Sequence, residues 1–397
     1  MQPVALGACG LVSAAGSGLA AFSDLLASGR SALKPITHPR LPAPVWLGRV
    51  AGLEDLHWPA QFEGWDSRAT RLAWLGLLSD DFLAAAQQAC ARWGAHRVGL
   101  VLGTSASTIA VSEAAYRSLD EAGGFAHDFR HPRLNTLHAV TDFVQRAIGL
   151  GGPAVTVSTA CSSSAKAFAS AQRWLALDLV DAVVVAGVDA ISDSVLFGFH
   201  ALQLVSPSPC RPFDAQRQGI SVGEAAGFVL LQRGAGDVLL LGHGESNDAH
   251  HMSAPHPQGL GAEQALSAAL ARAGCAGEQI QALQLHGTGT LQNDAVEAAL
   301  VARCYGPDLL AGALKGALGH TMGAAGILGA LACVLSLREG LCGGSCHTRA
   351  VDAALPPRFA LQLQRDAQRR PVTRAASHAF GFGGNNAVLV FGAGDHG

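Results

Sequence analysis

The chain has 397 residues, of which 49% are hydrophobic and 14% are charged, and its formal net charge at pH 7 is −3. This length suits two domains, or one large domain with a duplicated core. The charge gives no indication of nucleic-acid binding, and we expect no membrane span because no apolar run reaches about twenty residues. The opening MQPVALGACGLVSAAG lacks the charged region of a secretory signal, and nine irregularly spaced cysteines favour reduced thiols in the cytoplasm.

Apolar runs and turn residues alternate along the chain in the manner of an α/β fold. The runs predict strands at residues 4–10, 97–105, 181–190, 227–233, 237–246, 280–286 and 387–392. Helices are expected at residues 18–29, 162–179 and 261–274. The proline-containing stretch 35–65 has no clear periodicity and is interpreted as a surface excursion. This alternation favours a parallel sheet flanked by helices.

Cys161 stands where a strand turns into a helix. AVTVS before it alternates β-branched residues, and SSSAKAFASAQRWLALDL after it is rich in Ala and Leu. Most cysteines are simply small buried hydrophobes. However, the first N–H groups of a helix lack partners and carry the positive end of the helix dipole. A thiol there is more easily ionised, and the N–H groups can hold a developing oxyanion, so Cys161 is the candidate nucleophile.

The second half of the chain repeats this arrangement with a histidine. GALKGALG precedes His320 and TMGAAGILGALACVLSL follows it, just as small residues and a helix surround Cys161. Two duplicated halves that meet face to face would bring Cys161 and His320 together at the ends of two central helices. Lys315, five residues before His320, belongs to the same group.

Two glycine-rich segments add to this candidate site. LHGTGTLQND places His286 at the end of a strand, and HAFGFGGNN forms a glycine-dense loop before the last strand. Glycine allows the backbone to approach a ligand closely, and the N–H groups of such a loop can complete an oxyanion hole. Each signal alone is weak, because single histidines and glycine loops are usually structural. Their combination with Cys161 and His320 is specific.

Five motifs carry a resemblance to a known family: STACSSSAKA, RPFDAQRQGISVGEAAGFVLL, LHGTGTLQNDAVEA, LKGALGHTMGAAG and HAFGFGGNNAVLVF. They resemble those of β-ketoacyl-[acyl-carrier-protein] synthases of the elongating type, in the thiolase superfamily, and the resemblance extends over essentially the whole chain. TACSSSAKAFASA together with RQGISVGEAAGF is similar to ketosynthases of aryl polyene clusters.

The resemblance implies an α/β thiolase fold, with duplicated mixed-sheet halves in a layered αβαβα arrangement. Residues 1–235 would carry the nucleophilic cysteine, and residues 236–397 would carry the two histidines. The implied activity is an acyltransferase reaction, the decarboxylative Claisen condensation of an acyl group on Cys161 with malonyl-acyl-carrier protein. The implied pathway is fatty acid or polyketide synthesis, aryl polyenes included.

The resemblance also implies partners. These are acyl carrier protein and a second subunit, which makes either a homodimer or a heterodimer with a related ketosynthase or chain-length factor. Substrates would arrive on phosphopantetheine, so no separate cofactor is implied. No metal is expected either, because Cys342, Cys346 and His347 have no second cluster to complete a four-ligand zinc site.

Residue roles follow from matching positions in the family. His286 and His320 match two histidines that donate hydrogen bonds to the malonyl thioester carbonyl and stabilise the enolate. The N–H groups of Cys161 and Phe382 match the oxyanion hole, and Phe382 also matches a mobile gate. Lys315 matches a lysine whose role is electrostatic. Three further positions match substrate-binding residues: Thr288, Thr290 and Phe380.

One position departs from the family pattern. The family commonly has a glutamate nine residues after the second histidine, paired with the lysine, whereas this chain has Gly329. Lys315 must therefore find another partner or remain solvated, and Asp294 and Glu297 are candidates by sequence alone.

Three other classes of protein share parts of this pattern. A thiolase would have a second cysteine in the late glycine loop, which here reads GFGGNN. Initiating and chalcone-type synthases have an asparagine where His320 stands. A non-catalytic chain-length factor usually lacks the cysteine, whereas this chain retains Cys161, His286 and His320.

Carrier proteins are acidic, so a net-negative enzyme needs a local basic patch to dock them. Arg68 and Arg71 in DSRATRLAW have the spacing to share one helix face and are candidates for this patch. The alternative interpretation is an ordinary solvated helix face.

Overall fold

The computed structural model describes residues 2–125 and 132–394. Its largest sheet consists of two sets of strands, which β1 and β10 join by antiparallel pairing. In spatial order, the first set is β1 (Val4–Ser13), β9 (Ala225–Gln232), β7 (Ala182–Asp189), β5 (Val98–Gly103) and β6 (Ala154–Val157). The second set is β10 (Val238–Asn247), β16 (Asn385–Ala393), β15 (Arg374–Gly381), β11 (Ala282–Gln284) and β12 (Leu310–Gly312).

The two sets also match in strand direction. β5 pairs in parallel with β6 and β7, and β11 pairs in parallel with β12 and β15. Every other neighbouring pair in the two sets is antiparallel. The duplicated mixed-sheet halves are thus confirmed, and the wholly parallel sheet expected from alternation is wrong, because apolar runs do not reveal strand direction. The predicted boundary after residue 235 falls between β9 and β10.

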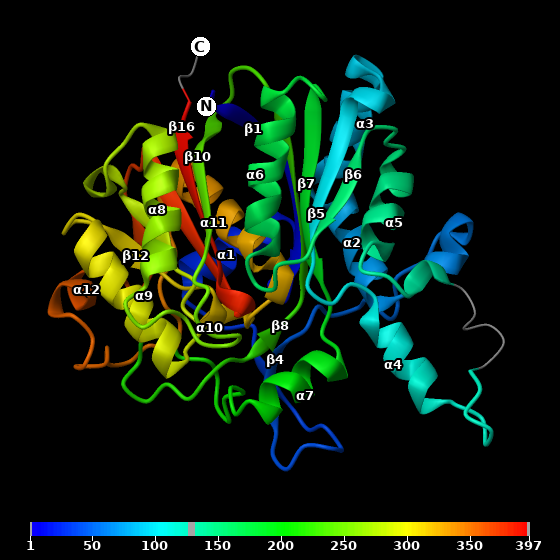
Figure 1. Cartoon of the computed structure of the whole chain (residues 1–397), viewed down its shortest axis with the longest axis horizontal. Helices are drawn as coiled ribbons and strands as arrows, with labels where there is room; N and C mark the ends of the chain where they lie inside the picture. Colours follow the sequence, from blue (N-terminus) through cyan, green and yellow to red (C-terminus); the bar gives the residue numbers. More distant parts are fainter. Residues whose placement is uncertain (1, 126–131, 395–397) are drawn as a thin grey trace.

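Helices form three layers around the two strand sets, which confirms the αβαβα arrangement (Figure 1). The outer layer on the first set is α2 (Arg68–Leu78), α3 (Phe82–Trp93) and α5 (Ala139–Ile148). The outer layer on the second set is α8 (Leu260–Ala273), α9 (Leu291–Cys304) and α12 (Pro357–Gln362). The central layer includes α1 (Leu19–Ser28), α6 (Ser163–Ala176) and α11 (Ala325–Glu339). Shorter helices are α4 (Ile109–Arg117), α7 (Asp193–Ala201) and α10 (Lys315–Leu318).

The two central helices approach each other very closely. A methyl group in place of the Gly326 hydrogen would lie 2.4 Å from the backbone nitrogen of Ala165. The Ile327 N–H also donates to the Ser164 hydroxyl at 2.9 Å. The stretch Met322–Glu339 is long and apolar enough to cross a membrane by length and composition, but 78% of it is buried inside the protein. We interpret it as the central helix of the core.

The stretch 35–65 is more ordered than the sequence indicated. β3 (Lys34–Ile36) and β4 (Val45–Gly48) form a small sheet with β8 (Val222–Gly223). Phe62 and Trp65 are buried in the core beside α2. Most of this stretch does lie at the surface, as expected, but its short strands and buried aromatic side chains were not predicted, because strands this short leave too little periodicity to detect. The remaining short strands are β2 (Gly16–Ser17), β13 (Leu341–Cys342) and β14 (Gln368–Arg369).

Candidate active site

Cys161 lies in the turn between β6 and α6, as predicted. Ala160 has a left-handed φ of 52°, so the chain bends sharply immediately before the thiol. The N–H groups of Ser162 and Ser163 bond to carbonyls within this turn. The backbone N–H groups of Cys161 and Phe382 lower the pKa of the Cys161 thiol, so both lie near its sulfur. The oxyanion hole that the resemblance implied at these two residues stays a prediction.

The structure brings His320 and Cys161 together, as the internal repeat predicted. His320 Nε2 lies 2.9 Å from the Cys161 sulfur. His320 Nδ1 accepts the backbone N–H of Met322 at 3.1 Å, so in the neutral ring the proton sits on Nε2. His320 therefore presents a hydrogen-bond donor to the sulfur and to the space in front of it.

His286 lies beside His320, with 5.5 Å between the ring centroids. The Lys315 ammonium lies 3.3 Å from His286 Nδ1 and also donates to the His286 carbonyl. Because an ammonium only donates, Nδ1 accepts and Nε2 carries the proton. Both histidines thus expose Nε2–H groups, and Lys315 fixes the tautomer of His286.

Both histidines are held neutral. Burial lowers the pKa of His286 and His320 well below its usual value, and the nearby Lys315 charge lowers it further. A neutral imidazole in a closed site is a donor rather than a cation, which suits a group that stabilises an oxyanion.

The thiol of Cys161 behaves differently from the sequence-based expectation. Cys161 is only 7% exposed, and burial raises the pKa of its thiol to about 11. The Lys315 charge and the nearby backbone N–H groups of Phe382 and Cys161 lower the pKa without cancelling the effect of burial. The expectation of a more easily ionised thiol is therefore wrong for this structure, because desolvation outweighs the helix terminus.

Lys315 is buried and bonds to His286 rather than to a carboxylate. Asp294 and Glu297 raise its pKa through their charges, but burial is the largest effect and lowers the pKa overall. A side chain at position 329 would require the Ser377 hydroxyl to move, because a Cβ on Gly329 would lie 2.3 Å from it. Lys315 thus has electrostatic partners in α9 and a hydrogen-bonding partner in His286.

Aromatic rings border the approach to the thiol. Phe382 packs against Phe199 with ring centroids 5.8 Å apart, and Phe199 lies 6.3 Å from His320. Phe380 lies 5.8 Å from the His286 ring. Gly381 between them lies close to the nucleophile turn, because its Cβ would be 3.1 Å from the Cys161 nitrogen. The gate and substrate-binding positions therefore meet at Cys161.

A cavity of about 760 Å³ leads to Cys161. Cys161, His286 and His320 line it together with the other predicted residues Thr288, Thr290, Phe380 and Phe382. Thr288 and Thr290 share a hydrogen bond of 2.8 Å between their hydroxyls. This cavity has the size of a typical small-molecule site.

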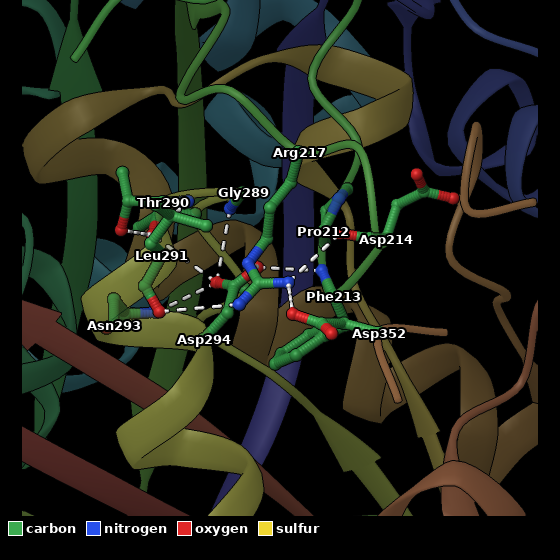
Figure 2. Close-up of polar contacts among 12 residues, drawn as sticks. Pro212, Phe213, Asp214, Arg217, Gly289, Thr290, Leu291, Asn293, Asp294 and Asp352 are labelled. Carbon is green, nitrogen blue, oxygen red and sulfur yellow. Dashed lines mark hydrogen bonds and ion pairs between the residues drawn. The ribbon is translucent and has the colours of Figure 1, made fainter. Parts of the chain in front are cut away.

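The sequence analysis missed Arg217, which lines the same cavity and is buried. Figure 2 shows its guanidinium between Asp294 and Asp352, with Nη1 2.6 Å from Asp352 and Nε 3.7 Å from Asp294. Asp294 in turn accepts the N–H groups of Phe213 at 2.7 Å and of Gly289 at 3.2 Å. Burial raises the pKa of Asp294 to about 6. The motif RPFDAQRQG contains Arg217, but the motif alone does not indicate that Asp294 and Asp352, which are distant in sequence, contact it.

Arg68 and Arg71 do not line the cavity that leads to Cys161. Arg68 donates through Nε to the buried Glu224 carboxylate at 2.8 Å, and its side chain is 17% exposed. Arg71 bonds to Asp66 at 2.6 and 2.8 Å. The carrier-docking role stays a prediction, and these contacts give both arginines structural partners.

A thiol beside two neutral histidine donors, set in a duplicated α/β fold, is typical of a carbon–carbon condensing enzyme. Family comparison agrees with this class. Residues 1–235 match the β-ketoacyl synthase N-terminal domain, and residues 238–349 match the β-ketoacyl synthase C-terminal domain. The chain belongs to the β-ketoacyl synthase family.

Individual relatives support the same activity. Nodulation protein E of Rhizobium meliloti (strain 1021) is 31% identical over 97% of this chain and 96% of its own length. The 3-oxoacyl-[acyl-carrier-protein] synthase 2 of Staphylococcus aureus is 30% identical over 75% of this chain and 75% of its own. A chain of the solved complex between the ketosynthase ApeO and its chain length factor ApeC from Xenorhabdus doucetiae is 34% identical, with a TM-score of 0.89 over 99% of this chain and 98% of that chain. These similarities support an acyltransferase of the condensing-enzyme type.

Proposed function

We propose that this chain is the catalytic subunit of a ketosynthase that extends an acyl group in aryl polyene synthesis. The resemblance of TACSSSAKAFASA and RQGISVGEAAGF to aryl polyene ketosynthases supports this pathway, and so does the 34% identity to a chain of the ApeO–ApeC complex over nearly the full length of both chains. The observation that carries the catalytic role is the 2.9 Å contact between Cys161 and His320. A chain-length factor, the alternative class, is not catalytic and would not require Cys161, His286 and His320 together.

The proposed reaction begins at the thiol. The Cys161 thiol loses its proton as its sulfur attacks the acyl thioester carbonyl. The tetrahedral intermediate collapses, the bond between the acyl carbon and the carrier sulfur breaks, and the carrier sulfur takes up a proton and leaves as a thiol. Malonyl-carrier protein then loses CO₂, and the electron pair of the broken bond moves onto the thioester oxygen as an enolate. The Nε2–H groups of His286 and His320 stabilise that oxygen.

The enolate carbon next attacks the acyl carbonyl on Cys161. The N–H groups of Cys161 and Phe382 hold the tetrahedral oxyanion, which collapses and releases the sulfur. Thr288 and Thr290 bond the phosphopantetheine arm in the cavity. The chain supplies all of these groups itself, so the proposal includes no metal or separate cofactor.

The proposal also extends to partners and location. We infer that acyl carrier protein delivers the substrates and that a related ketosynthase-fold subunit, such as a chain-length factor, completes a dimer. ApeO itself forms a complex with its chain length factor, ApeC, which supports this arrangement. We further infer a cytoplasmic enzyme without a membrane span. Fractionation of native cells, followed by immunoblotting, tests this location.

Three variants test the catalytic roles. Cys161→Ala should abolish condensation, because no other group can hold the acyl chain, whereas Cys161→Gln should retain malonyl decarboxylation. His286→Ala should lose about 10²–10³-fold in decarboxylation, the cost of one oxyanion-hole donor, and lose much less in acyl transfer to Cys161.

The two half-reactions are measured separately, by acyl transfer from radiolabelled acyl-carrier protein and by CO₂ release from malonyl-carrier protein. Elongation by pure Cys161→Ala protein would refute the assignment. Equal loss of both half-reactions in His286→Ala would mean that this histidine serves the thiol rather than the enolate.

A further inference from the structure

A chain of buried hydrogen bonds reaches His286 from behind the active site. Glu297 of α9 accepts the backbone N–H groups of His286 and Gly287, each at 2.8 Å. His378 of β15 places Nδ1 3.0 Å from the same carboxylate and Nε2 2.8 Å from the Tyr305 hydroxyl. The side chains of Glu297 and His378 are 0% exposed, and Tyr305 is also 0% exposed.

The proton positions in this chain follow from the groups involved. A carboxylate oxygen only accepts hydrogen bonds. His378 Nδ1 therefore carries a proton and donates a hydrogen bond to Glu297. In the neutral ring, Nε2 then accepts the Tyr305 hydroxyl. A buried carboxylate is costly unless it is well hydrogen-bonded. His378 supplies one of three N–H donors that satisfy Glu297, and it is the only side chain among those three.

The carboxylate in turn fixes the backbone of the catalytic histidine. Gly287 has a left-handed φ of 47°, and its Cβ would lie 2.7 Å from that of Ala313, so the turn has little freedom. Glu297 holds both N–H groups of this turn, while Lys315 holds Nδ1 of the His286 ring. The direction of the His286 Nε2–H group therefore depends on Lys315 at the ring and on Glu297 at the backbone.

We propose that His378 is a positioning residue for His286, acting through Glu297, and that Tyr305 holds the His378 ring. The inference rests on the proposed function, in which His286 donates to the enolate oxygen. Small displacements of a catalytic group reduce rate strongly, because the donor must meet the charge where it develops. His378 thus serves decarboxylation rather than acyl transfer.

His378→Leu and His378→Asn form a matched pair for the test. Leu removes the donor to Glu297, whereas the Asn amide nitrogen can take the place of Nδ1 and keep that bond. We expect His378→Leu to lower kcat for malonyl decarboxylation about 10- to 100-fold, by analogy with residues that orient metal ligands. KM for malonyl-carrier protein and acyl transfer to Cys161 should stay within about threefold of the parent. His378→Asn should recover most of the lost kcat.

Control measurements separate positioning from folding and from the proposed function itself. Circular dichroism and thermal melting establish that each variant is folded. If His378→Leu does not fold, Glu297→Gln replaces it and should show the same selective loss in kcat. Equal loss of acyl transfer and decarboxylation, or no recovery in His378→Asn, would overturn the positioning role. A parent enzyme that transfers acyl groups but does not decarboxylate malonyl-carrier protein would overturn the proposed function instead.

Discussion

At the scale of single residues, burial and the charge of Lys315 have opposite effects on the reactivity of Cys161. Burial raises the pKa of the thiol to about 11, while Lys315 lowers it. Because the thiolate is the reactive form, iodoacetamide labelling of Cys161 should accelerate about tenfold for each pH unit between pH 7 and 9, without a plateau. The measurement is the pH dependence of the labelling rate, followed by peptide mass spectrometry.

Lys315→Met provides the matched comparison for this experiment. Loss of the nearby positive charge should raise the thiol pKa further and slow labelling at every pH in that range. A plateau below pH 8 in the parent would show that the helix terminus outweighs burial, as the sequence alone indicated.

Cys161, His286 and His320 were predictable from the sequence, and the residues that support them were not. Cys161 and His320 each stand before a small-residue helix, so the repeat in the sequence revealed their juxtaposition. His378 and Tyr305 contact Glu297 from β15 and from the end of α9, and no local pattern connects them. A buried polar network depends on which segments meet in space, and a single sequence does not record that.

At the scale of secondary-structure elements, the close contact of α6 and α11 positions the two halves of the site. Gly326 allows this contact, because a methyl group there would lie within 2.9 Å of three atoms of Ala165. We expect Gly326→Ala to destabilise the protein by about 1–3 kcal/mol through overpacking. Because α6 follows Cys161 and α11 follows His320, condensation should also fall. Urea denaturation and the steady-state rate are the measurements.

Gly198 offers a control glycine in a helix. It lies exposed in α7, and a methyl group there would meet no atom within 4 Å. Gly198→Ala should leave stability unchanged or raise it by up to about 1 kcal/mol, since alanine favours helix. Equal stability of both variants would show that the helix contact tolerates a methyl group and does not fix the site.

Element prediction succeeded where patterns were long and failed where they were short. α8 was expected at 261–274 and lies at Leu260–Ala273, and β7 was expected at 181–190 and lies at Ala182–Asp189. β11 was expected to reach His286 but ends at Gln284, because the backbone of His286 bonds to Glu297 rather than to a strand. Tertiary hydrogen bonds thus set boundaries that apolar runs cannot show.

At the scale of the whole molecule, β6 is the edge strand at one end of the largest sheet. It pairs with β5 on one side, and Val155 in its middle is 41% exposed. An exposed apolar edge strand is a ready surface for another chain. The low content of charged residues, 14%, also favours a subunit that buries surface against a partner. We therefore expect the proposed dimer to form through β6.

Val155→Lys tests this interface, because an edge lysine opposes strand pairing across chains. Leu361→Lys is the matched control, since Leu361 is 80% exposed but lies in α12, in the outer layer of the other strand set. Light scattering after size-exclusion chromatography, with the chain purified alone and with a co-expressed chain-length-factor subunit, gives the mass of each assembly. We expect the parent and Leu361→Lys to form dimers and Val155→Lys to shift to monomer. A Val155→Lys protein that keeps the parent mass would place the interface on another surface.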